Sequence, residues 1–422
     1  MTSEMKTVAV VGQGYVGLPV AMRAVEQGYR VIGVDLDARR IDSLRAGESY
    51  VDDIPNAQLR DALAAGSYTP TTDYADAAGF DVAVITVPTP LRDSLPDLSF
   101  IESSGASLAA LLTAGATVVL ESTTYPGTTE ELLVPILESG SGLVAGVDFH
   151  VGYSPERIDP GNTTWGFVET PKVVSGITPA SLVAVQAFYD TLVDTTVAVS
   201  GTKEAELTKL LENTFRHVNI ALVNELAIFA NQLGVNVWES IDAASTKPFG
   251  FMKFTPGPGV GGHCLPVDPS YLSWEVRRKL GQSFRFVELA NDINDHMPVY
   301  VAQRLMLLLN EQGKAVRGSR IALVGLAYKK NSGDIRESPA LRLIELLQEF
   351  GAEIVGVDDH VEPHRWPEGV GKVDLTADMI AGVDAAVLIT DHDDLDLSVL
   401  NDGSTPVLDT RNRLGGESIE RL

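Results

Sequence analysis

The sequence predicts an α/β fold, with two doubly wound parallel-sheet domains joined by a long central helix and a helical middle domain. Two observations predict this class. Short apolar runs alternate with helical patterns through the first half of the chain, which is the rhythm of a parallel sheet. The rhythm returns near the C-terminus, where residues 320–328 and 351–358 repeat the pattern of residues 7–17 and 28–35. The strands expected in the first half are residues 7–11, 30–35, 81–87, 116–121 and 172–175.

A long helix is expected over residues 202–234, and a shorter one over residues 338–350, inside the second sheet domain. Apolar residues recur in the long helix mostly at three- and four-residue spacing, which is the period of one helix face. Residues 313–319 have the composition of an exposed connector. We therefore expect three domains, at residues 1–200, 201–312 and 313–422. The apolar residues of the long helix are Leu207, Leu210, Leu211, Phe215, Val218, Leu222 and Leu226.

Composition excludes several classes of protein. The 422 residues are 45% hydrophobic and 21% charged, which is ordinary for a soluble globular chain. The formal charge of 32 − 57 = −25 repels polyanions, so we expect no nucleic-acid partner. We also expect no membrane span and no signal peptide. A single cysteine excludes an intrachain disulfide and a cysteine-built zinc site, and it favours a cytoplasmic location and chemistry without a metal.

The first strand runs into Gly12-Gln13-Gly14-Tyr15-Val16-Gly17, a pattern that predicts a dinucleotide site. The glycines permit a tight turn and close approach of a pyrophosphate, while the next helix offers amide donors at its N-terminus. Asp35 ends the following strand, where it would bind the adenosine ribose hydroxyls. A carboxylate there repels a 2′-phosphate and favours NAD over NADP, although Arg40 would moderate this preference. A purely structural glycine turn is the alternative.

The only cysteine, Cys264, lies in a segment rich in glycine and proline, residues 257–268, which is unsuited to a hydrophobic core. This placement indicates a reactive thiol, because nearby positive charge or backbone amides favour the nucleophilic thiolate. Asp268 would serve as a base through a water, or would only form a turn before Pro269. We do not expect His263 to be the base, because neighbouring side chains in an extended loop point apart.

Lys209 and Asn213 lie four residues apart on the long helix and therefore share one face. Both can donate hydrogen bonds to an oxygen that becomes negative during a reaction. A solvated face is the alternative, since Glu206 and Glu212 also lie nearby in the sequence. The same alternative applies to Arg216 and His217, one turn further.

The repeat near the C-terminus differs from the first copy where a ligand would bind. The glycine fingerprint is replaced by a charged segment, Lys329–Glu337. We expect this copy to bind a nucleotide or phosphate rather than a second dinucleotide. A cationic patch here would allow a negatively charged protein to bind an anionic ligand.

A set of segments matches one known family jointly and specifically. The segments are Gly12–Gly17, Val87–Pro90, Glu121–Thr128, Ser154–Arg157, the pair Lys209 and Asn213, Gly261–Cys264 and Arg336–Pro339. Together they resemble the UDP-sugar 6-dehydrogenase family, the superfamily of UDP-glucose and UDP-mannose dehydrogenases, and the resemblance runs nearly end to end. It implies two Rossmann-like domains and a protein that is dimeric or larger, with the long helix at the interface.

The resemblance implies a four-electron oxidation of the C6 alcohol of a UDP-sugar to a uronic acid, with two NAD molecules as acceptors. The aldehyde formed first would be trapped as a thiohemiacetal, oxidised to a thioester and released by water. The implied catalytic residues are Cys264 as nucleophile, Lys209 and Asn213 as donors to the reacting oxygen, Asp268 and Thr123 as groups that position or activate water, and Glu156 as an acid–base group.

The resemblance also implies two sets of binding residues. The residues expected to contact NAD are Gly12, Gly14, Tyr15, Val16, Gly17, Asp35, Arg40, Pro88, Thr89, Thr123 and Arg336. Those expected to contact the UDP-sugar are Arg157, Lys209, Asn213, Arg216, His217, Phe249, Phe251, Gly259, Gly261, Tyr328, Lys329 and Arg411.

The sugar itself is the least constrained part of the prediction. Enzymes of the family that oxidise UDP-glucose receive a substrate arginine from the partner subunit, sixteen residues before the cysteine, and this chain has Pro248 there. Residues 154–162, 219–225, 246–251 and 256–269 look most like the branch that oxidises N-acetylated sugars, above all UDP-N-acetylglucosamine. UDP-N-acetylmannosamine and UDP-glucose are the alternatives.

Two other classes of function stay open. An NAD-dependent nucleotide-sugar epimerase or dehydratase would pair the same ligands, but such enzymes use a Tyr-x-x-x-Lys pair, and Tyr300 is followed by Arg304 instead. A redox sensor or scaffold would need only NAD binding and a thiol. Net formation of NADH separates the dehydrogenase from both.

Overall fold

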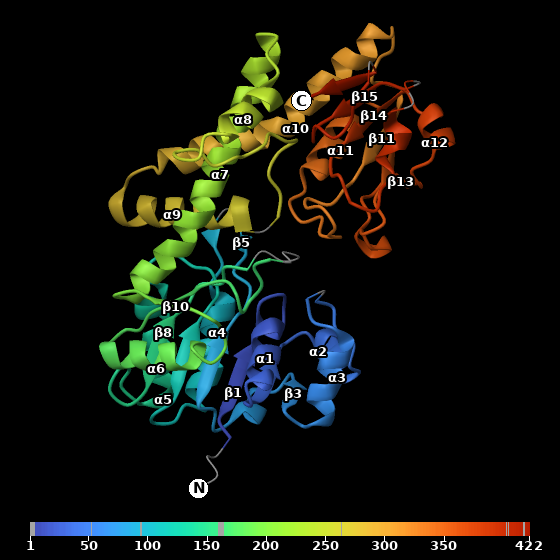
Figure 1. The fold of residues 1–422 in the computed structure, drawn as a ribbon. Coiled ribbons are helices and arrows are strands. Elements are labelled where there is room, and N and C mark those ends of the chain that lie inside the picture. Colours follow the sequence, from blue (N-terminus) through green and yellow to red (C-terminus); the bar gives the residue numbers. More distant parts are fainter. Residues whose placement is uncertain are drawn as a thin grey trace. The chain divides into compact units, whose positions relative to one another are not determined.

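The computed structural model describes residues 5–51, 53–92, 95–158, 164–262, 264–401, 403, 405–416 and 418–422, without the side chains of Leu91, Cys264 and Pro266. The chain divides into two compact units, Met1–Glu212 and Asn213–Leu422, and each unit contains one six-stranded parallel sheet (Figure 1).

The sheet of the first unit has the order β3-β2-β1-β4-β7-β8. Its order reverses beside β1, and sheets of this kind bind ligands at the carboxyl ends of the strands on either side of the reversal, here β1 and β4. The strands of this sheet are β1 (Thr7–Val11), β2 (Arg30–Val34), β3 (Tyr68–Thr71), β4 (Val82–Ile85), β7 (Thr117–Leu120) and β8 (His150–Tyr153). Smaller pairs are β5 (Leu91–Arg92) with β6 (Leu95–Pro96), and β9 (Lys172–Val174) with β10 (Thr196–Ala198).

Both faces of this sheet are buried, which explains why β1, β4 and β7 are continuous apolar runs rather than alternating ones. One core cluster packs α1, α3 and α6 against one face, and a second packs α4 and α5 against the other. The helices of the unit are α1 (Gly17–Glu26), α2 (Ala38–Arg45), α3 (Asn56–Ala64), α4 (Ser99–Ala109), α5 (Val134–Ser141) and α6 (Pro179–Tyr189), with short turns η1 (Tyr74–Ala77) and η2 (Thr129–Leu133).

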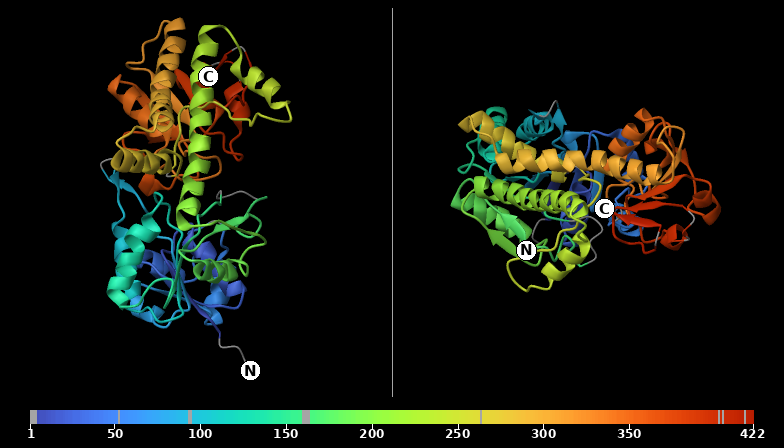
Figure 2. Two further views of the ribbon diagram at one scale, coloured as in Figure 1. Left: turned by 90° about the vertical axis from the view of Figure 1, so that its left-hand side faces the viewer. Right: turned by 90° about the horizontal axis from the view of Figure 1, so that it is seen from above.

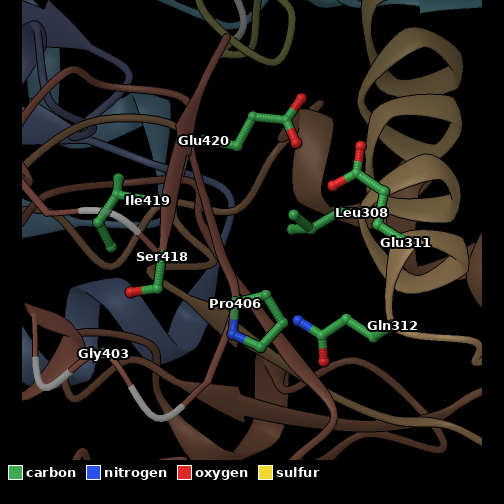
Figure 3. A pocket seen from close by; sticks show the side chains of 8 residues that line it. All are labelled: Leu308, Glu311, Gln312, Gly403, Pro406, Ser418, Ile419 and Glu420. Carbon is green, nitrogen blue, oxygen red and sulfur yellow. The ribbon is translucent and has the colours of Figure 1, made fainter.

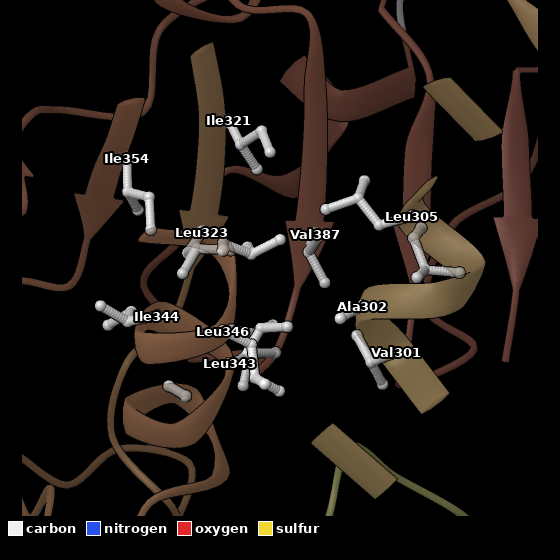
Figure 4. Packing of buried hydrophobic residues seen from close by; sticks show 14 of the residues in the cluster. Val301, Ala302, Leu305, Ile321, Leu323, Leu343, Ile344, Leu346, Ile354 and Val387 are labelled. Atoms are coloured by element: carbon white, nitrogen blue, oxygen red, sulfur yellow. The ribbon is translucent and has the colours of Figure 1, made fainter. Parts of the chain in front are cut away.

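The sheet of the second unit repeats the first, in the order β13-β12-β11-β14-β15-β16. Ile321, Leu323 and Val387 face a core formed with α10 and α11, as Figure 4 illustrates, while the opposite face packs against α12 and η4. The strands are β11 (Arg320–Val324), β12 (Glu353–Val357), β13 (Gly371–Lys372), β14 (Ala385–Leu388), β15 (Val407–Asp409) and β16 (Ile419–Arg421). The helices of this sheet domain are α11 (Pro339–Glu349), α12 (Ala377–Ala381), η3 (Pro363–Arg365) and η4 (Leu397–Asn401).

The helical middle of the chain consists of α7 (Thr202–Gln232), α8 (Val237–Ser245), α9 (Cys264–Leu280) and α10 (Arg285–Glu311). The C-terminal part of α10 lies along β14, β15 and α11 (Figure 2). Among the described helices, none has an apolar stretch of the length and purity that crossing a bilayer requires.

The predicted fold class is confirmed, because both halves of the chain form doubly wound parallel sheets of the same strand order. Two details of the strand prediction were wrong. The strand expected at residues 172–175 is present as β9, but it pairs with β10 in a separate two-stranded sheet, and β3 and β8 at the edges of the first sheet were not predicted. The division into three domains at residues 200 and 312 stays a prediction.

Candidate active site

The glycine turn after β1 leaves no room for a side chain at Gly12 or Gly17. Gly12 has a φ of 92°, and a Cβ there would lie 2.8 Å from the carbonyl oxygen of Thr86. A Cβ on Gly17 would lie 1.7 Å from the carbonyl oxygen of Gly12. A Cβ on Gly14 would point into open space, which is the side from which a pyrophosphate can approach the backbone. These residues fit a dinucleotide.

Asp35 lies at the carboxyl end of β2, beside this turn. Its Oδ2 accepts hydrogen bonds from the Gln13 amide at 2.8 Å and from the Arg40 guanidinium at 3.3 Å. The Arg40 guanidinium lies 5.9 Å from the ring centre of Tyr50, whose hydroxyl donates to the Gln13 carbonyl oxygen. Burial raises the pKa of Tyr50, so its hydroxyl keeps its proton at neutral pH. Arg40 and Asp35 are therefore neighbours at the edge where a ribose would bind.

Thr89 and Thr123 lie together at the carboxyl ends of β4 and β7. The Thr89 hydroxyl donates a hydrogen bond of 2.9 Å to the Thr123 carbonyl oxygen, and the Thr123 side chain is half-buried. Pro88 is exposed, and Tyr15 stands out from the glycine turn with 49% of its surface exposed. The predicted NAD-contacting residues of the first unit thus lie along one edge of the sheet.

Glu156 lies three residues after the end of β8, and both of its carboxylate oxygens have partners within the protein. Its Oε1 accepts hydrogen bonds of 2.6 Å from the amides of Arg157 and Ile158, and its Oε2 lies 3.4 Å from the Lys172 ammonium. Arg157 forms a 2.6 Å ion pair with Glu212 and donates to the Pro171 carbonyl oxygen. The structure therefore supplies fixed partners to both predicted residues.

Lys172 forms a buried ionic cluster that the sequence did not indicate. Its ammonium lies 3.0 Å from Glu121 and 3.4 Å from Glu156, and the Tyr189 hydroxyl donates to the same Glu121 oxygen. Burial works to lower the pKa of Lys172, but the two carboxylates outweigh it and raise the pKa, so the ammonium stays charged. Burial raises the pKa of Glu121, against the pull of Lys172. The hydrophobic pattern does not single out this lysine, because it is the first residue of an apolar strand.

Glu206 joins α7 to the segment that carries Thr123. Its carboxylate accepts hydrogen bonds from the Gly127 amide at 2.5 Å, the Thr129 amide at 2.8 Å and the Thr129 hydroxyl at 2.7 Å. The side chain is fully buried, and this burial raises its pKa to about 7. Lys209, one turn later on α7, is 9% exposed. The alternative of a solvated helix face therefore does not hold for Glu206 and Lys209.

In the second unit, Asn213 and Asp268 meet although they lie 55 positions apart in the chain. The Asn213 Nδ2 donates a hydrogen bond of 2.6 Å to the Asp268 Oδ2, and both side chains are buried. Asp268 lies in the second turn of α9, whose first residue is Cys264. The thiol of Cys264 lies outside the described part of the structure, as does His263.

The loop of residues 257–262, which we call the glycine loop, lies against the start of the C-terminal sheet domain. The Gly262 amide donates a hydrogen bond of 3.0 Å to the Arg336 carbonyl oxygen. A Cβ on Gly262 would lie 2.7 Å from the Tyr328 ring, and one on Gly257 would lie 3.1 Å from the Arg411 guanidinium. The loop thus brings backbone close to Tyr328, Arg336 and Arg411, three predicted binding residues.

Other predicted sugar contacts are exposed or have a partner within the protein. His217 is buried, with its Nε2 2.7 Å from the Asn291 Oδ1. Arg216 is exposed, as are Phe249 and Phe251 at 70% and 43%.

The second sheet carries a counterpart of Asp35 with different partners. Asp358 ends β12, and its Oδ2 accepts from the amides of Leu326 and Ala327 and from the His392 ring at 3.1 Å. Although burial works to raise the pKa of Asp358, these hydrogen bonds lower it. Asp358 is fully buried, whereas 8% of the Asp35 surface is exposed, so the second copy offers no ribose acceptor like Asp35.

His392 also belongs to a group of metal-ligand types with His360 and Asp394. The His392 Nδ1 accepts a hydrogen bond of 2.9 Å from the Asn331 amide, so in the neutral ring the proton sits on Nε2, facing Asp358. Both ring nitrogens therefore have protein partners. We assign no metal to the group.

A cavity of about 360 Å³ lies beside the C-terminal end of α10 (Figure 3). Ser418 and Pro406 in its wall precede β16 and β15, so the cavity lies toward the amino ends of these strands. Ligands of such sheets bind at the carboxyl ends. We therefore do not assign this cavity to the nucleotide. It is lined by Leu308, Glu311, Gln312, Gly403, Pro406, Ser418, Ile419 and Glu420.

A glycine cradle with an aspartate at the end of the next strand, and a second sheet of the same strand order, define a dinucleotide-binding class of protein with two Rossmann-like domains. Comparison with known families narrows the class. The models of the UDP-glucose/GDP-mannose dehydrogenase family match residues 6–193 as the NAD binding domain, 203–296 as the central domain and 322–415 as the UDP binding domain. The chain belongs to this family, and it is an NAD-dependent UDP-sugar dehydrogenase.

Individual relatives cover nearly the whole chain. The UDP-N-acetyl-D-mannosamine dehydrogenase of Pyrococcus horikoshii is 36% identical over 386 residues, which are 91% of this chain and 89% of the relative. The NDP-N-acetyl-D-galactosaminuronic acid dehydrogenase of Ralstonia solanacearum is 35% identical over 97% of this chain and 96% of its own. The solved structure of the Pyrococcus horikoshii UDP-D-ManNAc dehydrogenase superimposes with a TM-score of 0.89 at 34% identity, covering 98% of each chain. The predicted family, enzyme class and cofactor are therefore confirmed.

Proposed function

We propose that this enzyme oxidises C6 of a UDP-N-acetylhexosamine to the UDP-uronic acid, with UDP-N-acetylmannosamine as the first candidate. The observation that carries the proposal is the Asn213–Asp268 hydrogen bond beside the start of α9, in a unit whose glycine loop contacts Tyr328, Arg336 and Arg411. The Asn213–Asp268 pair fits a polar reaction centre, and the arginines beside the glycine loop fit a site for an anionic nucleotide.

The proposed chemistry assigns each residue a task. Lys209 and Asn213 donate to the C6 oxygen as it gains negative charge. The Cys264 thiolate adds to the aldehyde carbon, and loss of a second hydride from the thiohemiacetal gives a thioester. Water then cleaves the thioester with Asp268 as the base, which returns the thiol and releases the acid. The turn at residues 12–17 and Asp35 would hold NAD, which would accept the hydride in each of the two oxidations.

The choice of sugar rests on the relatives. Their names mention UDP-N-acetyl-D-mannosamine and NDP-N-acetyl-D-galactosaminuronic acid, which share an acetamido group at C2. UDP-N-acetylglucosamine, favoured by the sequence segments, differs from the mannosamine compound only in the configuration at C2 and is the second candidate. Pro248, at the place of the arginine expected for UDP-glucose oxidation, argues against UDP-glucose.

The test is a panel of UDP-sugars assayed for NADH and acid. We expect about two NADH for each N-acetylated sugar consumed. The epimerase alternative produces no net NADH, and the sensor alternative produces no turnover. A higher kcat/KM for UDP-glucose than for every N-acetylated sugar would overturn the proposed specificity.

Cys264→Ala tests the covalent step separately. Because the substitution removes only the nucleophile, we expect UDP-sugar and NADH to bind nearly as in the native enzyme while acid formation is lost. Mass spectrometry of the native enzyme stopped during turnover should reveal a glycosyl adduct on this one cysteine. Normal acid formation by the variant contradicts covalent trapping.

We also infer a dimer or larger assembly with α7 at the interface. Leu222, Leu226 and Phe229 are each about half exposed and lie four and three residues apart along α7, and Leu233, which is 77% exposed, follows directly after the helix. An apolar stripe of this period is the pattern of a helix that packs against another helix. Leu226→Glu with Phe229→Glu should lower the mass measured by light scattering to that of one chain, and an unchanged oligomer contradicts the interface.

A further inference from the structure

A buried row of polar side chains runs from α10 through α7 to the glycine loop. The Gly257 amide donates 2.9 Å to the Asn224 Oδ1, and the Asn224 Nδ2 donates 2.9 Å to the Asn294 Oδ1. The Asn294 Nδ2 in turn lies 3.4 Å from the His217 Nδ1, and the His217 Nε2 lies 2.7 Å from the Asn291 Oδ1. Asn224 and His217 lie on α7, and the other two asparagines lie on α10.

The direction of every hydrogen bond in this row follows from one backbone group. A backbone N–H can only donate, so Gly257 fixes the Asn224 oxygen toward the loop and its NH₂ group toward Asn294. Asn294 must then present its oxygen to Asn224 and its NH₂ group to the His217 Nδ1. That nitrogen must accept, so the proton of the neutral ring lies on Nε2 and points to Asn291.

Because the row is buried, loss of any one of its hydrogen bonds leaves a polar group without a partner. Asn224, Asn294 and His217 are at most 3% exposed, so water cannot replace a lost partner. Burial lowers the pKa of His217, and the ring is neutral at pH 7. The link between Asn294 and His217 is the longest, and the same NH₂ group lies 3.4 Å from the His217 carbonyl oxygen, which gives it a second acceptor.

The row ends at a place that matters for the proposed chemistry. Gly257 begins the glycine loop, and Gly262 at its other end donates to the Arg336 carbonyl oxygen. Cys264 begins α9 two residues later. The loop is thus held at one end by the buried row and at the other by the C-terminal sheet domain.

We propose that His217, Asn294 and Asn224 are positioning residues, a directed hydrogen-bond relay that holds the glycine loop in the conformation needed for reaction at Cys264. The proposal rests on the proposed function, since it assigns these residues to the support of that site. It also gives His217 a role different from the sugar contact expected from the sequence.

The test is hydrogen exchange of the Gly257 amide in the full-length enzyme without sugar. Asn224→Leu removes the acceptor of this amide, and we expect its exchange to become at least about tenfold faster. His217→Leu does not touch the loop, yet it leaves Asn294 without its ring partner, and we expect exchange at Gly257 to rise at least about fivefold. His217→Asn, which can offer an oxygen near the place of Nδ1, should return exchange to within about twofold of the native rate.

Asn219→Leu is the matched control. Asn219 lies on the same helix, is half-exposed, and donates only to the Phe215 carbonyl oxygen among the described contacts. This variant should leave Gly257 exchange unchanged. If the leucine variants do not fold, as judged by thermal melting and NADH binding, Asn294→Ser removes the middle link more gently and should give the same acceleration.

Activity supplies the second readout. Because positioning acts on the reacting geometry, kcat should fall about tenfold in Asn224→Leu and His217→Leu while the KM values for UDP-sugar and NAD change less than about threefold. Unchanged Gly257 exchange in His217→Leu, or equal acceleration in Asn219→Leu, would overturn the relay. The exchange measurement needs no turnover, so it stands even if the enzyme oxidises a sugar other than the one proposed.

Discussion

The Asn213 side-chain amide donates a 2.6 Å hydrogen bond to the carboxylate of Asp268, inside one compact unit of the enzyme. An amide that donates to a carboxylate holds it in one orientation. A carboxylate held in one orientation is suited to the role of base proposed for Asp268. The pair therefore leads to the first prediction.

Asp268→Asn should lower kcat by about 10²- to 10⁴-fold, because the amide cannot take a proton from water. Asn213→Ala should lower kcat by about 10²- to 10³-fold, since it removes one donor to the developing negative charge. Steady-state NADH formation measures both. Asn219→Ala, on the same helix, should stay near the native rate, and losses confined to KM would mean that the pair only binds substrate.

Asp35→Ala should lower kcat/KM for NAD by about tenfold to a hundredfold, because hydrogen bonds from the ribose to a carboxylate are lost. The value for NADP should change by less than about threefold, since the native carboxylate repels the 2′-phosphate and Arg40 remains. Kinetics with both cofactors at one UDP-sugar concentration give the ratio. Equal losses for the two cofactors contradict the role assigned to Asp35.

Glu206 should make the stability of the enzyme depend on pH. Burial raises its pKa from 4.5 to about 7, so between these values the folded state binds a proton that the unfolded state has lost. The stabilisation from this group is complete below pH 4.5 and is lost as pH rises through 7, by at most about 3 kcal/mol. Urea unfolding at pH 5 and pH 7.5 measures the change.

Glu206→Gln cannot titrate, and its unfolding free energy should therefore vary less between the two pH values than that of the native enzyme. Glu204→Gln is the control, because Glu204 is exposed on the same helix. If Glu206→Gln keeps the full native pH dependence, the raised pKa belongs to another group.

Lys172→Met should destabilise the enzyme by about 3–5 kcal/mol, because it leaves the carboxylates of Glu121 and Glu156 buried without their cation. Adding Glu121→Gln should recover part of the loss. Lys203→Met is the control, since this half-exposed lysine pairs with Glu131 at the surface and should contribute less than about 1 kcal/mol. Equal effects of the two lysines in denaturant unfolding contradict the cluster.

Most of the fold could be predicted because its signals are local. β1, β4, β11 and β14 are apolar runs buried on both faces, and Gly12 and Gly17 lie where a side chain would strike the carbonyl oxygens of Thr86 and Gly12. The carboxylates that end β2 and β12 are likewise visible as aspartates after apolar strands.

The site could be predicted only in part, because its contacts join distant parts of the chain. Asn213 meets Asp268 across 55 positions, and the Gly262 amide meets Arg336 across 74. No periodicity of Asn224 or Asn294 indicates that they meet, and Lys172 looks like any residue at the start of a strand. Partners of this kind follow from helix and sheet packing, which a local pattern does not contain.

The different partners of the two aspartates at the ends of β2 and β12 restrict attempts to engineer a second dinucleotide site into this enzyme. The Asp358 carboxylate accepts from the Leu326 and Ala327 amides and from His392 and is fully buried, whereas Asp35 accepts from the Gln13 amide and from Arg40, whose side chain is 45% exposed. Grafting the glycines of the first turn onto the second sheet would thus not create a second dinucleotide pocket. The imidazole of His392 would also have to be removed, and its hydrogen bond to Asp358, which distinguishes the second sheet from the first, would be lost with it.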